Sequence, residues 1–226
     1  MDGSQSYGQY CGMARGAEIF ATPWTPIIVR NVLLGASTFG EILDGAPGLS
    51  RTLLSQRLRM LQRHGVIQQH QPEGRRPTYR PTEAGVALWP VIESLGHWGE
   101  QWLNLAPHHL DAGVVLWVLA RKITPELLPR TRTVVRIEVS DDKRGRFWLL
   151  ADPVHVEVCL RPPGDADDAV IHTTRDALTR WHLGKLTLPR AVRDGLMRAE
   201  GTRSVVRMFS SWGGRGSFLE PVASAN

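Results

Sequence analysis

The chain has 226 residues, 42% hydrophobic and 22% charged, a composition that suits two ordinary globular domains. It has no run of roughly 20 apolar residues that would span a membrane, and its polar start argues against a secretory signal, so we expect a cytoplasmic protein. The two distant cysteines, Cys11 and Cys159, argue against a disulfide framework.

Positive charge is concentrated in residues 45–80. This window holds seven arginines and one acid, Glu73, whereas the whole chain has a net charge of only +5. The rest of the chain is therefore close to neutral. A localised basic region of this kind predicts a binding site for a polyanion.

Residues 21–103 have a mainly helical pattern with one strand-like interruption. Residues typical of helix starts and glycines typical of helix ends delimit three helices. They are 27–34 after Pro26, 38–43 after Ser37, and about 14 residues between Ser50 and Gly65.

The third predicted helix separates leucines from polar residues. One face holds Leu53, Leu54, Leu58 and Leu61. The opposite face has no acid and consists of Arg51, Thr52, Ser55, Gln56, Arg59, Gln62 and Arg63. Such side chains contact base edges and phosphates in a DNA major groove. A merely solvated basic face is the alternative.

Arg57 falls within the leucine face, where a charge needs a partner. We expect it to pair with Glu41 and so brace two helices, with direct DNA contact as the alternative.

Residues 66–70 and 78–80 read as the strands of a hairpin whose tip carries Arg75 and Arg76. Beside a recognition helix, such a hairpin is a wing that contacts phosphates or a minor groove, although a tip without function would also be polar. Thr82 then caps a long helix, broken or kinked near Pro90. Its three tryptophans, Trp89, Trp98 and Trp102, indicate extra core or, as we favour, a dimer seam.

Residues 11 to about 103 resemble the winged helix-turn-helix domain of HxlR-family bacterial transcriptional regulators, relatives of the MarR group. The resemblance lies in Cys11, 24–25, 33–35, 39–42, 47–50, 54–61, 65–67, Tyr79 and 82–85. It implies a homodimer built through terminal helices that regulates neighbouring genes. Gly12, where the family usually has proline, and Pro26 depart from the pattern. Cys11 is either a redox sensor, as in some relatives, or a buried cysteine.

A second domain is predicted after the break at residues 106–109. Its pattern gives helices at 110–121, 124–129, 176–182, 186–194 and 202–212, and strands at 133–139, 146–151, 155–160, 169–173 and 196–200. The expected class is α+β: an N-terminal winged helix-turn-helix, mostly α with a two-stranded wing, and a separate α+β domain with a mainly antiparallel sheet. The predicted domains are 11–104 and 110–212, followed by a flexible tail, 213–226.

This second domain resembles the sterol carrier protein type 2-like fold, a twisted sheet with helices over an apolar tunnel. The resemblance lies in residues 175–178, 183–186, 191–196, 200–201 and 209–212. It implies binding of a hydrophobic small molecule. The candidate cavity residues, each of which ordinary core packing would also explain, are Trp148, Leu150, Val156, Val158 and Trp181.

Enzyme signatures such as Gly-x-Ser-x-Gly, a phosphate loop or His-Glu-x-x-His are missing. We therefore expect no catalytic residues, metal or cofactor. Residues 165–168 are acidic enough for calcium, but a turn between strands explains them better.

The sequence thus predicts a homodimeric regulator, a repressor, that binds a pseudo-palindromic operator in double-stranded DNA and senses a hydrophobic effector. The DNA-binding candidates are Ser50, Arg51, Thr52, Ser55, Gln56, Arg59, Arg63, Arg75 and Arg76. The alternative is a carrier of lipids or other hydrophobic ligands that uses the winged helix as a protein-interaction scaffold.

Overall fold

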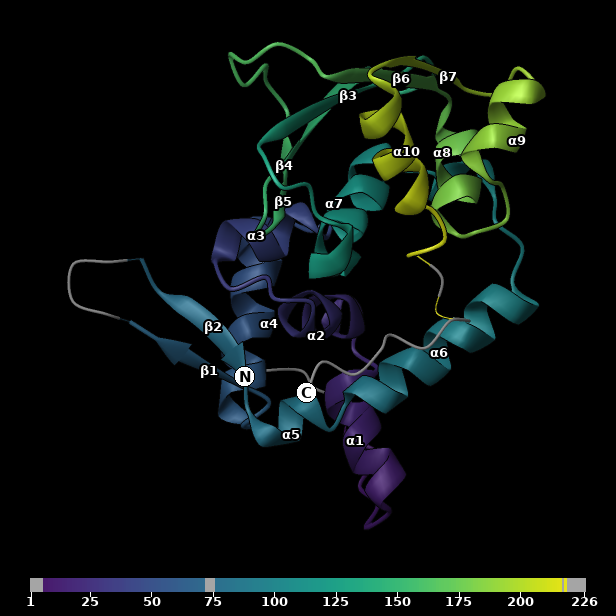
Figure 1. Ribbon diagram of the computed structural model, residues 1–226. Coiled ribbons are helices and arrows are strands. Elements are labelled where there is room, and N and C mark those ends of the chain that lie inside the picture. The colour runs from purple at the N-terminus through teal and green to yellow at the C-terminus, as the bar shows by residue number, and fades with distance from the viewer. Residues whose placement is uncertain (1–5, 72–75, 217, 219–226) are drawn as a thin grey trace. The chain divides into compact units, whose positions relative to one another are not determined.

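The computed structural model divides into two units, residues 1–96 and 97–226, and describes residues 6–71, 76–216 and 218. The first unit contains α1 (Gly12–Phe20), α2 (Thr25–Leu33), α3 (Phe39–Asp44), α4 (Arg51–Arg63), β1 (Ile67–His70), β2 (Thr78–Pro81), α5 (Glu83–Val86) and the start of α6 (Trp89–Trp102) (Figure 1). Among the described residues, no helix has both the length and the apolar character needed to cross a membrane.

Local side-chain chemistry sets the start of α3. Thr38 is its N-cap, one residue later than predicted, and Thr38 Oγ1 accepts a hydrogen bond from the Glu41 N–H at 3.2 Å. The Glu41 carboxylate in turn accepts from the backbone N–H groups of Ser37 and Thr38, at 2.8 and 3.0 Å. This reciprocal capping box fixes where the chain enters α3.

A buried polar network joins α2 to α3. Asn31 is fully buried, and its Nδ2 donates to the carbonyl of Ile42 at 3.0 Å. Arg30 Nη2 donates to Asn31 Oδ1 and to the Gly45 carbonyl, at 2.8 and 3.0 Å. Burial lowers the pKa of Arg30 to about 10. Because the polar side chains of Arg30 and Asn31 hydrogen-bond to each other and to carbonyl groups of Ile42 and Gly45, the network holds α2 and α3 in one relative orientation.

The second unit holds a five-stranded sheet and a set of helices. Its elements after α6 are η1 (Pro107–His109), α7 (Ala112–Lys122), η2 (Pro125–Leu127), β3 (Thr133–Val139), β4 (Arg146–Ala151), β5 (Val156–Cys159), β6 (Ala169–Thr173), α8 (Arg175–His182), α9 (Leu188–Arg193), β7 (Arg198–Gly201) and α10 (Arg203–Ser211). The strand order is β5-β4-β3-β6-β7, and only the β3–β6 pair is parallel among the described strands. The α+β class predicted from the sequence is confirmed.

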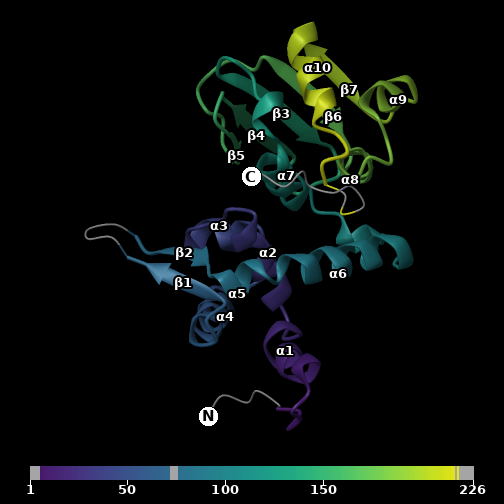
Figure 2. The same cartoon turned by 60° about the horizontal axis from the view of Figure 1, so that its bottom comes forward.

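Helices α7 to α10 pack on one face of this sheet (Figure 2). Val135, Ile137 and Val139 of β3 face them, whereas Arg136 and Glu138 point to the opposite face because side chains alternate along a strand. The core of the unit therefore lies on the helical face. The other face carries polar side chains near one end of the sheet.

Residues 213–216, placed by sequence in a flexible tail, pack against α8. The N–H of Gly214 donates to the carbonyl of Trp181 at 3.0 Å, and that of Gly216 donates to the carbonyl of His182 at 2.9 Å. A Cβ atom on Gly216 would lie 2.0 Å from the ring of His182, so this close approach requires glycine.

Burial of His182 predicts acid sensitivity. Desolvation, with a smaller contribution from the charge of Lys122, lowers the pKa of His182 to about 3. The unfolded chain titrates near 6.5, so between these pH values the unfolded state binds one more proton. Stability should fall with pH below 6.5, by about 2 kcal/mol at pH 5 from this group alone. Urea unfolding of the full chain at several pH values measures the effect.

The control compares His182→Asn with the same change at the exposed His108. Only His182→Asn should flatten the pH dependence between 6.5 and 5. Equal slopes for the two variants would contradict the assignment.

Candidate nucleic-acid interface

Helix α4 presents a polar face opposite a buried leucine face. Leu54, Leu58 and Leu61 are buried. Of the predicted DNA-binding residues, the exposed ones on α4 are Arg51, Thr52, Gln56, Arg59 and Arg63, and Ser55 is half-buried. At 100° per residue all six fall within an arc of about 140°. The structure therefore brings them together on one side of the helix.

Ser50 has a structural task. Its Oγ accepts a hydrogen bond from the Leu53 N–H at 3.2 Å, which makes it the N-cap of α4. An N-cap exchange for alanine costs about 1 kcal/mol of helix stability, so Ser50 positions the helix whether or not it contacts DNA.

The hairpin β1–β2 is fixed to the helices of the same unit. The Tyr79 N–H donates to the Ser37 carbonyl at 2.6 Å, which ties β2 to the segment before α3. Gln62 Nε2 donates to Gln69 Oε1 at 3.1 Å, which ties β1 to α4. A helix and a wing linked in this way can meet one DNA duplex together.

Three arginines of this surface have no acidic partner among the described residues. Arg59, Arg76 and Arg80 have no ion pair in the part of the chain that the structure describes, and Arg51 lies over the Phe39 ring, 5.4 Å from its centre. Arg75, the other predicted wing residue, lies outside the described residues. Unpaired arginines on an exposed face provide the charge that phosphate contacts need.

Arg57 has a different partner from the one predicted. Its Nε donates to the carbonyl of Pro23 at 3.2 Å, which braces α4 against the segment between α1 and α2. The expected ion pair with Glu41 is wrong, because the Glu41 carboxylate caps α3 instead. The bracing role remains, with a carbonyl in place of a carboxylate.

Sequence reasoning left Arg80 out of the DNA-binding set. It is exposed on β2, directly opposite Gln68 of β1. The feature of the sequence that could have identified it is its position within the arginine-rich window 45–80.

Cys11 is the half-buried residue that precedes α1. Hydrogen bonds from the backbone N–H groups of Ala14 and Met13 lower the pKa of its thiol. Sequence reasoning, which sought a neighbouring cation, missed this effect.

The five predicted ligand residues do not form one site. Trp148 and Leu150 lie on the sheet face opposite the helices, where Trp148 Nε1 donates to Asp167 at 3.2 Å. Val156 and Val158 belong to the packed face, and Trp181 is fully buried there, stacked on Phe209 with ring centres 4.4 Å apart. The sheet itself separates the two groups.

The acidic segment before β6 is used in structural contacts. Asp165 pairs with Arg132, Asp167 pairs with Arg136, and Asp168 accepts from the Val134 N–H at 2.8 Å. These three carboxylates therefore have structural partners, which agrees with the predicted turn between strands.

Residues 19–107 match a family model described as HxlR-like helix-turn-helix. The uncharacterised HTH-type transcriptional regulator YvaP of Bacillus subtilis is 33% identical over 99 residues, which cover 43% of this chain and 90% of YvaP. The uncharacterised HTH-type transcriptional regulator Rv3095 of Mycobacterium tuberculosis is 31% identical over 133 residues, 50% of this chain and 84% of Rv3095.

Among solved structures, the reduced form of the transcriptional regulator YodB from B. subtilis is 25% identical, covers 42% of this chain and 97% of YodB, and has a TM-score of 0.38. Residues 19–107, which match the family model, include α4, β1 and β2. Because the family model matches and the similarity to YvaP extends over 90% of that protein, this chain belongs to the HxlR-like helix-turn-helix family.

Proposed function

We propose that this chain is a transcriptional regulator that binds double-stranded DNA, with α4 in the major groove and the β1–β2 wing on the neighbouring backbone. The observation that carries the proposal is the acid-free polar arc of α4, attached to a buried leucine face. The names of the relatives, which are HTH-type transcriptional regulators, support it.

We further propose that the chain acts as a homodimer on a pseudo-palindromic operator. Four apolar residues of α6, Val91, Leu95, Trp98 and Trp102, are 47–66% exposed and follow helical spacing. A second copy of the chain would cover this stripe, and the two copies of α4 would then have to lie roughly 34–36 Å apart to enter successive grooves. Occupation of a promoter would block transcription, so repression is the proposed sign of regulation.

The second unit is proposed as the sensor. Its resemblance to the sterol carrier protein type 2-like fold stays a prediction. Because the sheet separates the five predicted cavity residues, an apolar ligand that touched all of them would have to displace packed core.

The salt dependence of DNA binding tests the proposal. If Arg51, Arg59, Arg63, Arg76 and Arg80 each neutralise one phosphate, the logarithm of the association constant should fall against the logarithm of the salt concentration with a slope near −4.5 per copy, and twice that for a dimer. Fluorescence anisotropy with a labelled duplex measures the slope. A chain that carries lipids and uses the winged helix only as a protein scaffold would show no such DNA affinity at low salt.

A further inference from the structure

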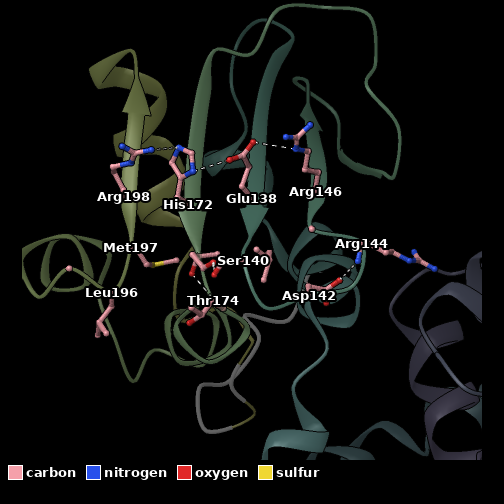
Figure 3. A pocket seen from close by; sticks show the side chains of 14 residues that line it. Glu138, Ser140, Asp142, Arg144, Arg146, His172, Thr174, Leu196, Met197 and Arg198 are labelled. Carbon is pink, nitrogen blue, oxygen red and sulfur yellow. Dashed lines mark hydrogen bonds and ion pairs between the residues drawn. The ribbon is translucent and has the colours of Figure 1, made fainter.

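A cavity of about 660 Å³ opens at one end of the five-stranded sheet in the second unit (Figure 3). The ends of β3, β4, β6 and β7 form it together with the turn 140–145 and the loop that precedes β7. None of the five ligand residues predicted from the sequence lines it. His172 of β6 is part of its wall and contacts charged side chains of both neighbouring strands.

His172 belongs to a row of four side chains that crosses the sheet in register. Arg198, His172, Glu138 and Arg146 occupy paired positions on β7, β6, β3 and β4, and Figure 3 shows them side by side. His172 Nδ1 lies 2.9 Å from Glu138 Oε2, and His172 Nε2 lies 3.2 Å from Arg198 Nη2. The imidazole therefore lies between a carboxylate and a guanidinium group.

These two contacts determine where the imidazole of His172 carries its proton. A guanidinium group has hydrogen-bond donors and no acceptor, so Arg198 can bond only to an Nε2 atom that has a free lone pair. The ring proton is then on Nδ1, which donates to the carboxylate of Glu138. The observed contacts therefore require a neutral imidazole that is protonated at Nδ1.

A second proton on His172 is incompatible with this arrangement. It would place an N–H group on Nε2, opposite the N–H groups of Arg198 at 3.2 Å, and would bring two positive charges together. A carboxylate is available instead, because Glu200 Oε1 lies 3.6 Å from His172 Nε2. Arg198 also binds Glu200, through Nε at 3.1 Å, and its side chain is 68% exposed, so its guanidinium group can turn toward solvent.

The other charged groups around the row are held by partners of their own. Arg136 and Arg146 both contact Glu138, the carboxylate that accepts from His172 Nδ1. In the turn at the edge of the cavity, Asp142 Oδ1 accepts the backbone N–H of Arg144 at 2.8 Å. Within the described part of the chain, Glu200 is therefore the carboxylate that a protonated Nε2 can use.

We propose that His172 is a proton-dependent switch in the wall of this cavity. In the neutral state its imidazole links β3 to β7 through Glu138 and Arg198. In the protonated state it links Glu138 to Glu200, and the guanidinium group of Arg198 turns away. Histidine is the side chain whose charge ordinarily changes between about pH 5 and pH 8. In the regulator, a step that rests on the proposed function, proton uptake at His172 is then an input of the sensor unit.

Proton–nitrogen NMR spectra of the full chain, isotopically labelled at histidine, test the switch without DNA. At about pH 8 we expect the ring of His172 to carry its proton on Nδ1. On acidification, Arg198→Met should raise the equilibrium constant for protonation of His172 about three- to tenfold, because a neighbouring cation is lost. Glu200→Gln should lower it by a similar factor, because the protonated ring loses its carboxylate. The matched control is Arg207→Met, an exposed arginine of α10 outside the cavity, which should change nothing.

A neutral ring protonated mainly at Nε2 would overturn the switch, and this measurement needs only the wild-type protein. Protonation constants that are equal in the wild type, Arg198→Met and Glu200→Gln would overturn it as well. Shifts of opposite sign in the two variants would not arise from a general loss of structure, which would move both in the same direction.

The regulatory step has a separate test. DNA affinity is measured at about pH 8 and about pH 6 for the wild type and for His172→Gln, which cannot take up the proton. We expect the ratio of the two affinities to differ at least about fivefold between the proteins. Acid sensitivity from His182 is common to both and cancels. Equal ratios would overturn the regulatory step alone, whereas no DNA binding by either protein would contradict the proposed function.

Discussion

Replacing Gly85 with alanine is expected to destabilise the first unit by about 3 kcal/mol, at the upper end of overpacking effects. Gly85 lies buried in α5, and an added Cβ would stand 2.2 Å from the carbonyl oxygen of Val66 and 3.3 Å from Pro81 Cβ. That carbonyl also accepts the Thr82 N–H at 3.1 Å, so it cannot move without loss of the bond that joins α5 to the wing.

Hydrogen–deuterium exchange on the full chain, followed by peptides of α4 and β1, measures the opening free energy of this unit apart from the other. Gly40→Ala is the matched control, since Gly40 lies within α3 and a Cβ there meets nothing within 4 Å. It should be neutral or stabilise by up to about 1 kcal/mol, because alanine is the better helix former. Unchanged protection in Gly85→Ala would contradict the prediction.

Much of the second unit follows from local pattern. The strands 133–139, 146–151 and 169–173 match the structure residue for residue, because β-branched and aromatic runs there end at glycine, proline and aspartate turns. The helix capped by Ser50 is also as predicted, since this N-cap and Gly65, which follows the helix at φ 67°, are both local signals.

Side-chain partners across the fold were not predictable from such signals. Because side chains alternate along β4, the sequence predicts that Trp148 and Phe147 lie on opposite faces of the sheet. It does not predict which of the two faces the helices cover, since that depends on how β3, β4 and β6 pair. The row Arg198–His172–Glu138–Arg146 brings together residues up to 60 positions apart and has no signature in the sequence.

Composition misled in the segment 213–216. A glycine-rich stretch after the last helix is typical of a loose tail. Here the missing side chains let the backbone approach Trp181 and His182, so the same residues permit close packing. Glycine content alone does not distinguish the two cases.

Replacing Arg59 with alanine is expected to weaken binding to the operator by about 1–3 kcal/mol, roughly 5- to 150-fold. Arg59 lies near the middle of the polar arc of α4, where a groove-bound helix comes nearest to the bases. Because it is exposed and has no ion pair among the described residues, the change should leave folding within about 0.5 kcal/mol of wild type. Fluorescence anisotropy at fixed salt, with a duplex selected by the wild-type protein from random sequences, measures the loss.

Two controls are needed to interpret the effect of Arg59→Ala. Arg207→Ala removes the same charge from an exposed site on α10 and should have little effect, which separates contact from net charge. A scrambled duplex then distinguishes the two kinds of contact: a base contact is lost on the selected sequence alone, whereas a phosphate contact is lost equally on both. Unchanged affinity for the selected duplex would remove Arg59 from the interface. It would also indicate that the wing makes the main DNA contacts, through Arg76 and Arg80, which have no partners among the described residues.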